Sequence, residues 1–202
     1  MTSIDLSGDL GLVALGLLTI NILLGLLISV RYDPLRAWPH RDWDVFVWHN
    51  WTGYVALAAC CLHPLPLLAS ARMPFTWAQI LWPVHAPSQP DANLIGALAL
   101  YLVALVVVTS FFRVALGRQR WKLIHYLSYA AFVLFFLHSL LIDPELRNRP
   151  VEWLDAEKVF VEACFLVVLA ASLARWQYAQ HHPQRLRVTP ATKRVPGFSP
   201  KT

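Results

Sequence analysis

The sequence contains few charged residues. Only 14% of its 202 residues are Asp, Glu, Lys or Arg, whereas 57% are hydrophobic. One soluble core of this size cannot bury so much apolar surface, so the excess must face lipid. We therefore predict that the chain is an integral membrane protein rather than a soluble one.

Cysteine and the common cofactor motifs are scarce as well. The three cysteines, Cys60, Cys61 and Cys164, lie in apolar runs without the spacing of a metal site, which is typical of small apolar fillers. The sequence has no C-x-x-C-H attachment motif and no G-x-G-x-x-G nucleotide loop. It also lacks a basic stripe with interleaved aromatics, so we expect no nucleic-acid partner.

Long apolar runs are abundant. Five segments approach the roughly 20 residues that a spanning helix needs, and they cover about 10–30, 45–69, 93–112, 121–142 and 159–176. The first is not typical of a cleavable signal, because Asp5 and Asp9 stand where a basic region belongs. We predict an all-α membrane bundle of five helices over residues 1–180, followed by a basic, proline-containing cytoplasmic tail over 181–202.

The positions of Lys and Arg predict the orientation of the bundle. With the N-terminus outside, the outer side receives only Arg72, Arg147, Arg149 and Lys158. All other basic residues, from Arg31 to Lys201, then fall on the inner side. This bias favours an N-out, C-in topology. The positive-inside rule then accounts for the basic balance of the chain, whose expected partner is membrane lipid.

Four histidines lie inside two of the predicted spans. The second span carries His49 and His63, and the fourth carries His125 and His138. These spans run in the same direction, so the first members of each are level, and so are the second members. A helical rise of 1.5 Å per residue separates the two levels by about 20 Å, which fits within a hydrocarbon core of about 30 Å.

Two stacked pairs of imidazoles favour haem iron over other occupants. A histidine alone in a span is often a hydrogen-bonding residue between helices, but four at matched levels indicate a function. Zinc would need further ligands at each level, and a covalent haem would need the missing attachment motif. We therefore predict two b haems with His49, His63, His125 and His138 as axial ligands.

The thirteen-residue step in the fourth span does not suit an ideal helix. On such a helix His138 points about 140° away from His125, whereas His63 points only about 40° away from His49. Either the fourth helix tightens or bends, or the two haems lie on different sides of it. The sequence leaves these alternatives open.

Haem propionates need cations, and basic residues stand near the inner histidines. Arg113, Arg118 and Arg120 precede His125 and are candidates to pair with inner propionates. Topology alone explains at least some of these arginines. We further expect a short amphipathic helix within residues 70–92 and an ion pair between Lys158 and Glu162, which are four residues apart.

The segment "TSFFRVALGRQRWKLIHYLSY" at 109–129, together with the paired histidines, resembles a known family. It is similar to the ferric reductase-like transmembrane domain of ferric reductases, NADPH oxidases and the haem-binding subunit of the methionine-sulfoxide reductase system. The resemblance implies an inner haem b between His49 and His125 and an outer one between His63 and His138. It further implies electron transport across the membrane, and we expect oxidoreductase activity on the same ground.

The resemblance also indicates possible partners. Such proteins usually continue into a flavin and nicotinamide domain, but only about twenty residues follow the fifth span here. We expect a separate flavin-containing reductase or quinol as donor, and ferric iron, oxygen or a periplasmic redox protein as outer acceptor. The short, flavin-free form favours the bacterial inner (plasma) membrane.

Three alternatives stay open at this point. The first is the methionine-sulfoxide reductase type, although its haem subunit typically has no histidine matching His49. The second is a structural haem subunit of a larger membrane complex. The third, at the level of the fold, is the four-helix superoxide-oxidising quinone reductase.

Overall fold

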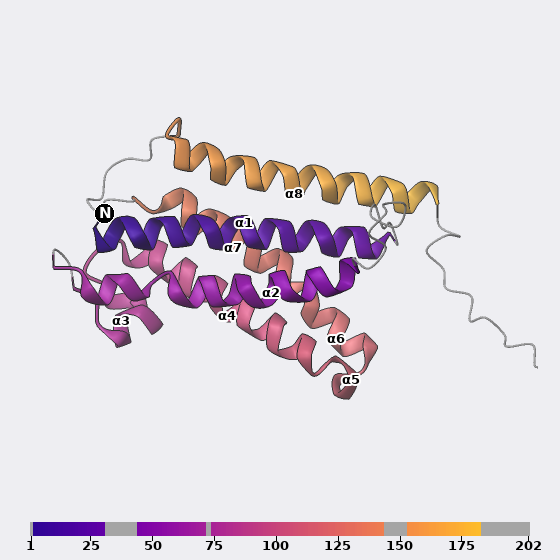
Figure 1. Ribbon diagram of the computed structural model, residues 1–202, viewed down its shortest axis with the longest axis horizontal. Coiled ribbons are helices and arrows are strands. Elements are labelled where there is room, and N and C mark those ends of the chain that lie inside the picture. Colours follow the sequence, from indigo (N-terminus) through magenta and orange to yellow (C-terminus); the bar gives the residue numbers. More distant parts are fainter. Residues whose placement is uncertain (1, 31–43, 72–73, 144–152, 183–202) are drawn as a thin grey trace, which may run out of the picture.

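The computed structural model describes residues 2–30, 44–71, 74–143 and 153–182. Regular secondary structure in these ranges is helical, without a strand. Five spans are long and apolar enough to cross a membrane, and successive spans run in opposite directions (Figure 1). The prediction of an all-α membrane bundle with five helices is confirmed, whereas its orientation in the membrane stays a prediction.

The five spans contain seven of the helical elements. They comprise α1 (Ser3–Ser29), α2 (Val45–Leu62) with its 3-10 continuation η1 (Leu65–Ala69), α4 (Pro90–Phe111), α6 (Arg118–His125) with α7 (Leu127–Leu141), and α8 (Ala156–His181). Short elements connect the spans, namely α3 (Trp77–Leu81), η2 (Pro83–His85) and α5 (Arg113–Leu116). The tail beyond residue 182 lies outside the described ranges.

The first helix begins seven residues earlier than the predicted span. Thr2 and Asp5 form a capping box, in which each side chain accepts a hydrogen bond from the other residue's backbone N–H. This pair satisfies two of the N–H groups that a helix start leaves without a partner, and the carboxylate suits the positive end of the helix dipole. Asp5 therefore belongs to the first turn of α1.

The bundle is built around α1, which packs against α2, α7 and α8, while α4 lies along α7 (Figure 1). Small side chains lie at the centre of this packing, where Ala14, Ala56, Ala99 and Ala131 are at most 1% exposed. Small residues let helices approach closely in a membrane, where apolar side chains gain little from leaving lipid. Large apolar side chains such as Val108 point outward instead.

The connection between α2 and α4 contains the predicted short helix. Thr76 and Gln79 form a capping box at the start of α3, which has only five residues. Trp77 and Trp82, at the two ends of α3, are 62% and 59% exposed, and α3 lies at the same end of the bundle as the N-terminus (Figure 1). Exposed tryptophans at one end of a spanning bundle are typical of the membrane interface.

The predicted ion pair between Lys158 and Glu162 is wrong. The ammonium of Lys158 instead donates to the backbone carbonyls of Ser139 and Ile142, at 2.7 and 2.6 Å. These carbonyls lie at the C-terminal end of α7, where a helix leaves carbonyls without partners and carries partial negative charge. In an apolar bundle this group of acceptors binds the ammonium in preference to a carboxylate one turn away.

Candidate functional site

The structure brings the four histidines together as two pairs. The imidazole centroids of His49 and His125 are 6.1 Å apart, and their planes are inclined at 71°. His63 and His138 repeat this arrangement, with centroids 6.1 Å apart and planes inclined at 74°. We call His49 and His125 the first pair, and His63 and His138 the second pair.

A break in the fourth span removes the predicted conflict of helical phase. The span is divided at Tyr126 into α6 and α7. The N–H of Tyr129 bonds the carbonyl of Tyr126 at 3.2 Å, three residues back, as in the tighter 3-10 helix. Because the turn tightens at this point, His125 and His138 both reach histidines of the second span.

Backbone carbonyls hold three of the four imidazoles in place. In each case Nδ1 lies within hydrogen-bond distance of a carbonyl on a neighbouring helix, and a carbonyl can only accept. Nδ1 therefore carries the proton, and the lone pair of Nε2 is available to bind a metal. The contacts are His49 to Asn21 at 3.0 Å, His63 to Ser7 at 2.6 Å and His138 to Ala92 at 2.8 Å.

Each of these carbonyls lies four residues before a glycine, so the glycine is one helical turn further along the same face. A side chain at these positions would crowd the imidazole. A Cβ atom at Gly11 would lie 3.0 Å from His63, one at Gly25 would lie 3.2 Å from His49, and one at Gly96 would lie 2.8 Å from His138. Glycine thus permits the close approach that the hydrogen bonds require.

His125 is held differently. Its Nδ1 lies 3.2 Å from the hydroxyl oxygen of Ser110, and the indole N–H of Trp121 donates to the same oxygen at 3.2 Å. The Trp121 ring also lies against the imidazole, with centroids 5.0 Å apart and planes tilted by 30°. A hydroxyl can donate or accept, so this contact does not by itself decide which nitrogen of His125 carries the proton.

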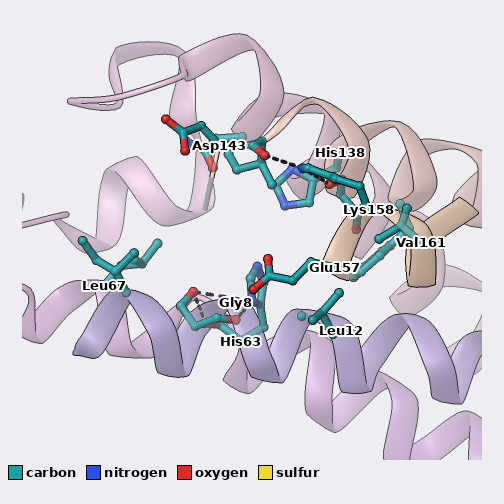
Figure 2. A pocket seen from close by; sticks show the side chains of 16 residues that line it. Gly8, Leu12, His63, Leu67, His138, Asp143, Glu157, Lys158 and Val161 are labelled. Carbon is teal, nitrogen blue, oxygen red and sulfur yellow. Dashed lines mark hydrogen bonds between the residues drawn. The ribbon is translucent and has the colours of Figure 1, made fainter. Parts of the chain in front are cut away.

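Two hollows adjoin the second pair, and both are lined by His63 and His138. The larger has a cavity volume of about 80 Å³, and the residues around it include Ser7, Glu157 and Lys158 (Figure 2). The other has a cavity volume of about 60 Å³ and a mainly apolar lining. Asn93 and Phe135 contribute to both hollows, which therefore meet at the imidazoles.

The predicted partners of the inner propionates lie in the two short helices that lead up to and contain His125. Arg113 lies in α5, and Arg118 and Arg120 lie in α6; all three are exposed. The guanidinium of Arg113 lies over the ring of Phe46, 4.9 Å from its centroid. Arg72, Arg147 and Arg149, which are basic residues of the predicted outer side, fall outside the described ranges.

Sequence reasoning missed the residues that position the four histidines. It identified the histidines but not Ser110 or the three glycines that contact them. Glycines inside the first and third apolar runs were a usable signal, because a glycine in a spanning helix often marks a close approach. The four-residue offset between carbonyl and glycine becomes informative only when the facing histidine is known.

The sequence matches the family described as ferric reductase like transmembrane component over residues 10–136, well over half of its length. The chain belongs to this family. Three of the four histidines lie within the matched range, and His138 follows two residues after it. Comparisons with curated proteins and with solved structures found no match.

Membership of the ferric reductase-like family indicates a membrane subunit that transfers electrons, and domains of this family generally bind haem. Among the described residues, no group of three or more His, Cys, Asp or Glu side chains is placed to hold a metal ion. Each histidine pair can offer a metal two imidazole nitrogens, one from each ring. The family resemblance predicted from the sequence is confirmed.

Proposed function

We propose that the chain is a di-haem b membrane protein that carries electrons across the membrane. His49 and His125 would hold one haem, and His63 and His138 would hold the other. The donor would be a flavoprotein or a quinol on the cytoplasmic side, and the acceptor would be ferric iron, oxygen or a periplasmic redox protein. The N-out, C-in topology and the bacterial inner membrane belong to this proposal.

The geometry of the two pairs carries the proposal. An imidazole nitrogen lies about 2 Å from a bound metal and about 1 Å from its ring centroid, so two rings on opposite sides of one iron have centroids about 6 Å apart. Both pairs have this separation, at 6.1 Å. Where Nδ1 bonds a backbone carbonyl, as in three of the four histidines, Nε2 is free to face the metal.

The surroundings of the second pair support a cofactor there. Haem held by these two imidazoles would need space beside them, and two hollows adjoin both imidazoles. Their linings are largely apolar, with Phe135 and Leu67 shared between them. Apolar walls with a few polar groups are typical of cofactor sites.

Haem held by two histidines supplies reversible one-electron chemistry without an open coordination position. The protein's own contribution is to orient the four imidazoles, to fix the proton on Nδ1 and to keep the site apolar. This ligation favours electron transfer over substrate binding at the iron. It distinguishes the proposal from an oxygenase or peroxidase function.

Two alternatives predict different haem contents. A methionine-sulfoxide reductase-type subunit would leave His49 without a haem to bind, whereas here His49 is paired with His125 as closely as His63 is with His138. A structural haem subunit would hold both haems but would not exchange electrons with a donor. The two-haem electron carrier therefore predicts one haem at each histidine pair.

The test is a pyridine haemochrome assay with reduced-minus-oxidised spectra on the purified protein. Wild-type protein should contain two b haems per chain, and His49→Ala and His138→Ala should each remove one. His85→Ala is the matched control, because His85 is an exposed histidine in η2 and should leave both haems in place. One haem that survives His49→Ala and is lost in His138→Ala would favour the sulfoxide-repair type. Absence of haem would refute the proposal.

A further inference from the structure

Lys158 is a charged side chain in the interior of the bundle. It is only 4% exposed, and it lies in the first turn of α8 beside the end of α7. Removing an ammonium from water is costly unless hydrogen bonds replace its hydration. The carbonyls of Ser139 and Ile142 supply two such bonds, at 2.7 and 2.6 Å.

These two bonds use only part of the donor capacity of Lys158. An ammonium has three N–H groups, and capping the end of α7 accounts for two of them. The side chain also lines the larger hollow, on the same wall as His138 (Figure 2). Among the described residues that line the two hollows, Lys158 is the single Lys or Arg.

The polar groups are distributed unequally between the hollows. The described residues that line the smaller hollow have only uncharged polar side chains besides the histidines, such as Gln79 and Asn93. The larger one contains Lys158 together with the carboxyl groups of Glu157 and Asp143. A group with both apolar and anionic parts would therefore find its cation in the larger hollow, with two carboxylates near enough to moderate the attraction.

Haem b is such a group, because its porphyrin is apolar and its two propionates are anionic. We infer that Lys158 pairs with a propionate of the haem held by His63 and His138, and so sets the rotational position of that haem between them. The inference rests on the proposed function. It assigns to a buried lysine at the second pair the role that the sequence suggested for exposed arginines near the first pair.

The alternative is that Lys158 only caps α7. The two roles differ in whether the effect of the lysine charge on the haem depends on the propionates. A cation paired with a propionate offsets the negative charge beside the iron and favours the reduced state. Removing the cation should then lower the reduction potential more when a free propionate is present than when both propionates are esterified.

A chemical double cycle tests this difference. The His49→Ala protein, which should retain only the second-pair haem, is reconstituted with haem b or with its dimethyl ester, which lacks free carboxylates. Each form is prepared with Lys158 and with Lys158→Met, and the midpoint potential of the haem is measured by redox titration. With haem b, Lys158→Met should shift the redox equilibrium at least tenfold toward the oxidised state, about 59 mV for one electron. With the dimethyl ester, the shift should be less than half as large.

Two further variants guard against loss of folding. Lys158→Gln keeps an N–H donor for the α7 carbonyls but not the charge, so it should reproduce the shift of Lys158→Met. Lys158→Arg keeps the charge and should retain a potential close to wild type. Equal shifts with haem b and with its ester would overturn the inference and leave Lys158 as a helix cap.

Failure of the proposed function gives a different result. If the His49→Ala protein binds no haem, the di-haem proposal fails before any potential is measured. If it binds one haem and the two shifts are equal, only the assignment of Lys158 fails.

Discussion

The two histidine pairs have the same ring geometry but different supports. Centroid separations are 6.1 Å in both, and the interplanar angles differ by a few degrees. Both imidazoles of the second pair bond backbone carbonyls, whereas in the first pair only His49 does so and His125 contacts a hydroxyl. One arrangement of rings can therefore be held by two kinds of hydrogen-bond partner.

The two kinds of partner constrain the imidazole to different degrees. A helical carbonyl is part of the backbone and can only accept, so it fixes the position of the ring and of the proton. The hydroxyl of Ser110 can rotate and can act as donor or acceptor. We expect the second pair to be the more rigid site and the first pair to depend on side chains that can be exchanged.

The largest expected effect comes from filling the space beside the second pair. In Gly96→Ala the new Cβ would lie 2.8 Å from His138, closer than atoms can pack, and both belong to helices that cannot easily move apart. We expect at least a fivefold loss of the second-pair haem, with the first-pair haem retained, measured as haem per chain. Gly16→Ala is the control, because its Cβ would meet only Phe160, at an ordinary 3.5 Å. Full haem content in Gly96→Ala would show that haem binding does not need the space that Gly96 leaves beside His138.

The next effect concerns the hydroxyl of the first pair. Ser110→Ala removes the hydroxyl that contacts Nδ1 of His125 and leaves the indole N–H of Trp121 without its acceptor. Loss of such a supporting contact typically weakens metal binding 10 to 100-fold, so the first-pair haem should dissociate faster by about that factor. Transfer of haem to an excess of apomyoglobin measures the rate.

Thr109→Ala is the matched control for Ser110→Ala. Thr109 is the preceding residue of α4, and its hydroxyl donates to the carbonyl of Leu105 in its own helix. Its removal should leave both haems unaffected. Equal dissociation rates in Ser110→Ala and wild type would mean that packing alone holds His125.

The smallest effect is expected from Trp121→Phe. This change keeps an aromatic ring beside His125 but removes the N–H that donates to Ser110. Since the serine oxygen remains available to His125, haem dissociation should accelerate less than threefold, below the effect of Ser110→Ala. The same haem-transfer experiment provides the comparison. An effect larger than that of Ser110→Ala would assign the main support to the ring contact.

The sequence predicted the spans because their signal is local. Hydrophobic length alone placed all five, and the pairing of levels followed from the helical rise and the direction of alternate spans. The thirteen-residue step also revealed that the fourth span could not be an ideal helix throughout. It did not reveal where the break lies, because no glycine or proline stands next to Tyr126 to mark it.

The prediction for Lys158 was wrong for a related reason. A pair of opposite charges four residues apart is a local pattern, and it would hold on an exposed helix. The strongest acceptors available to Lys158 are carbonyls of another helix, which are distant in sequence. The position of a buried ion depends on what it meets after the helices have packed.

The sequence by itself determined that this chain is a membrane bundle with four histidines at two levels, because hydrophobic length and helical rise are properties of each segment alone. The tertiary structure decided how those histidines are held. The carbonyls of Ser7, Asn21 and Ala92 and the hydroxyl of Ser110 become partners only when helices 15 to 56 residues apart along the chain lie side by side. Hydrogen bonds and steric contacts act over a few ångströms, so only packing can bring such groups together.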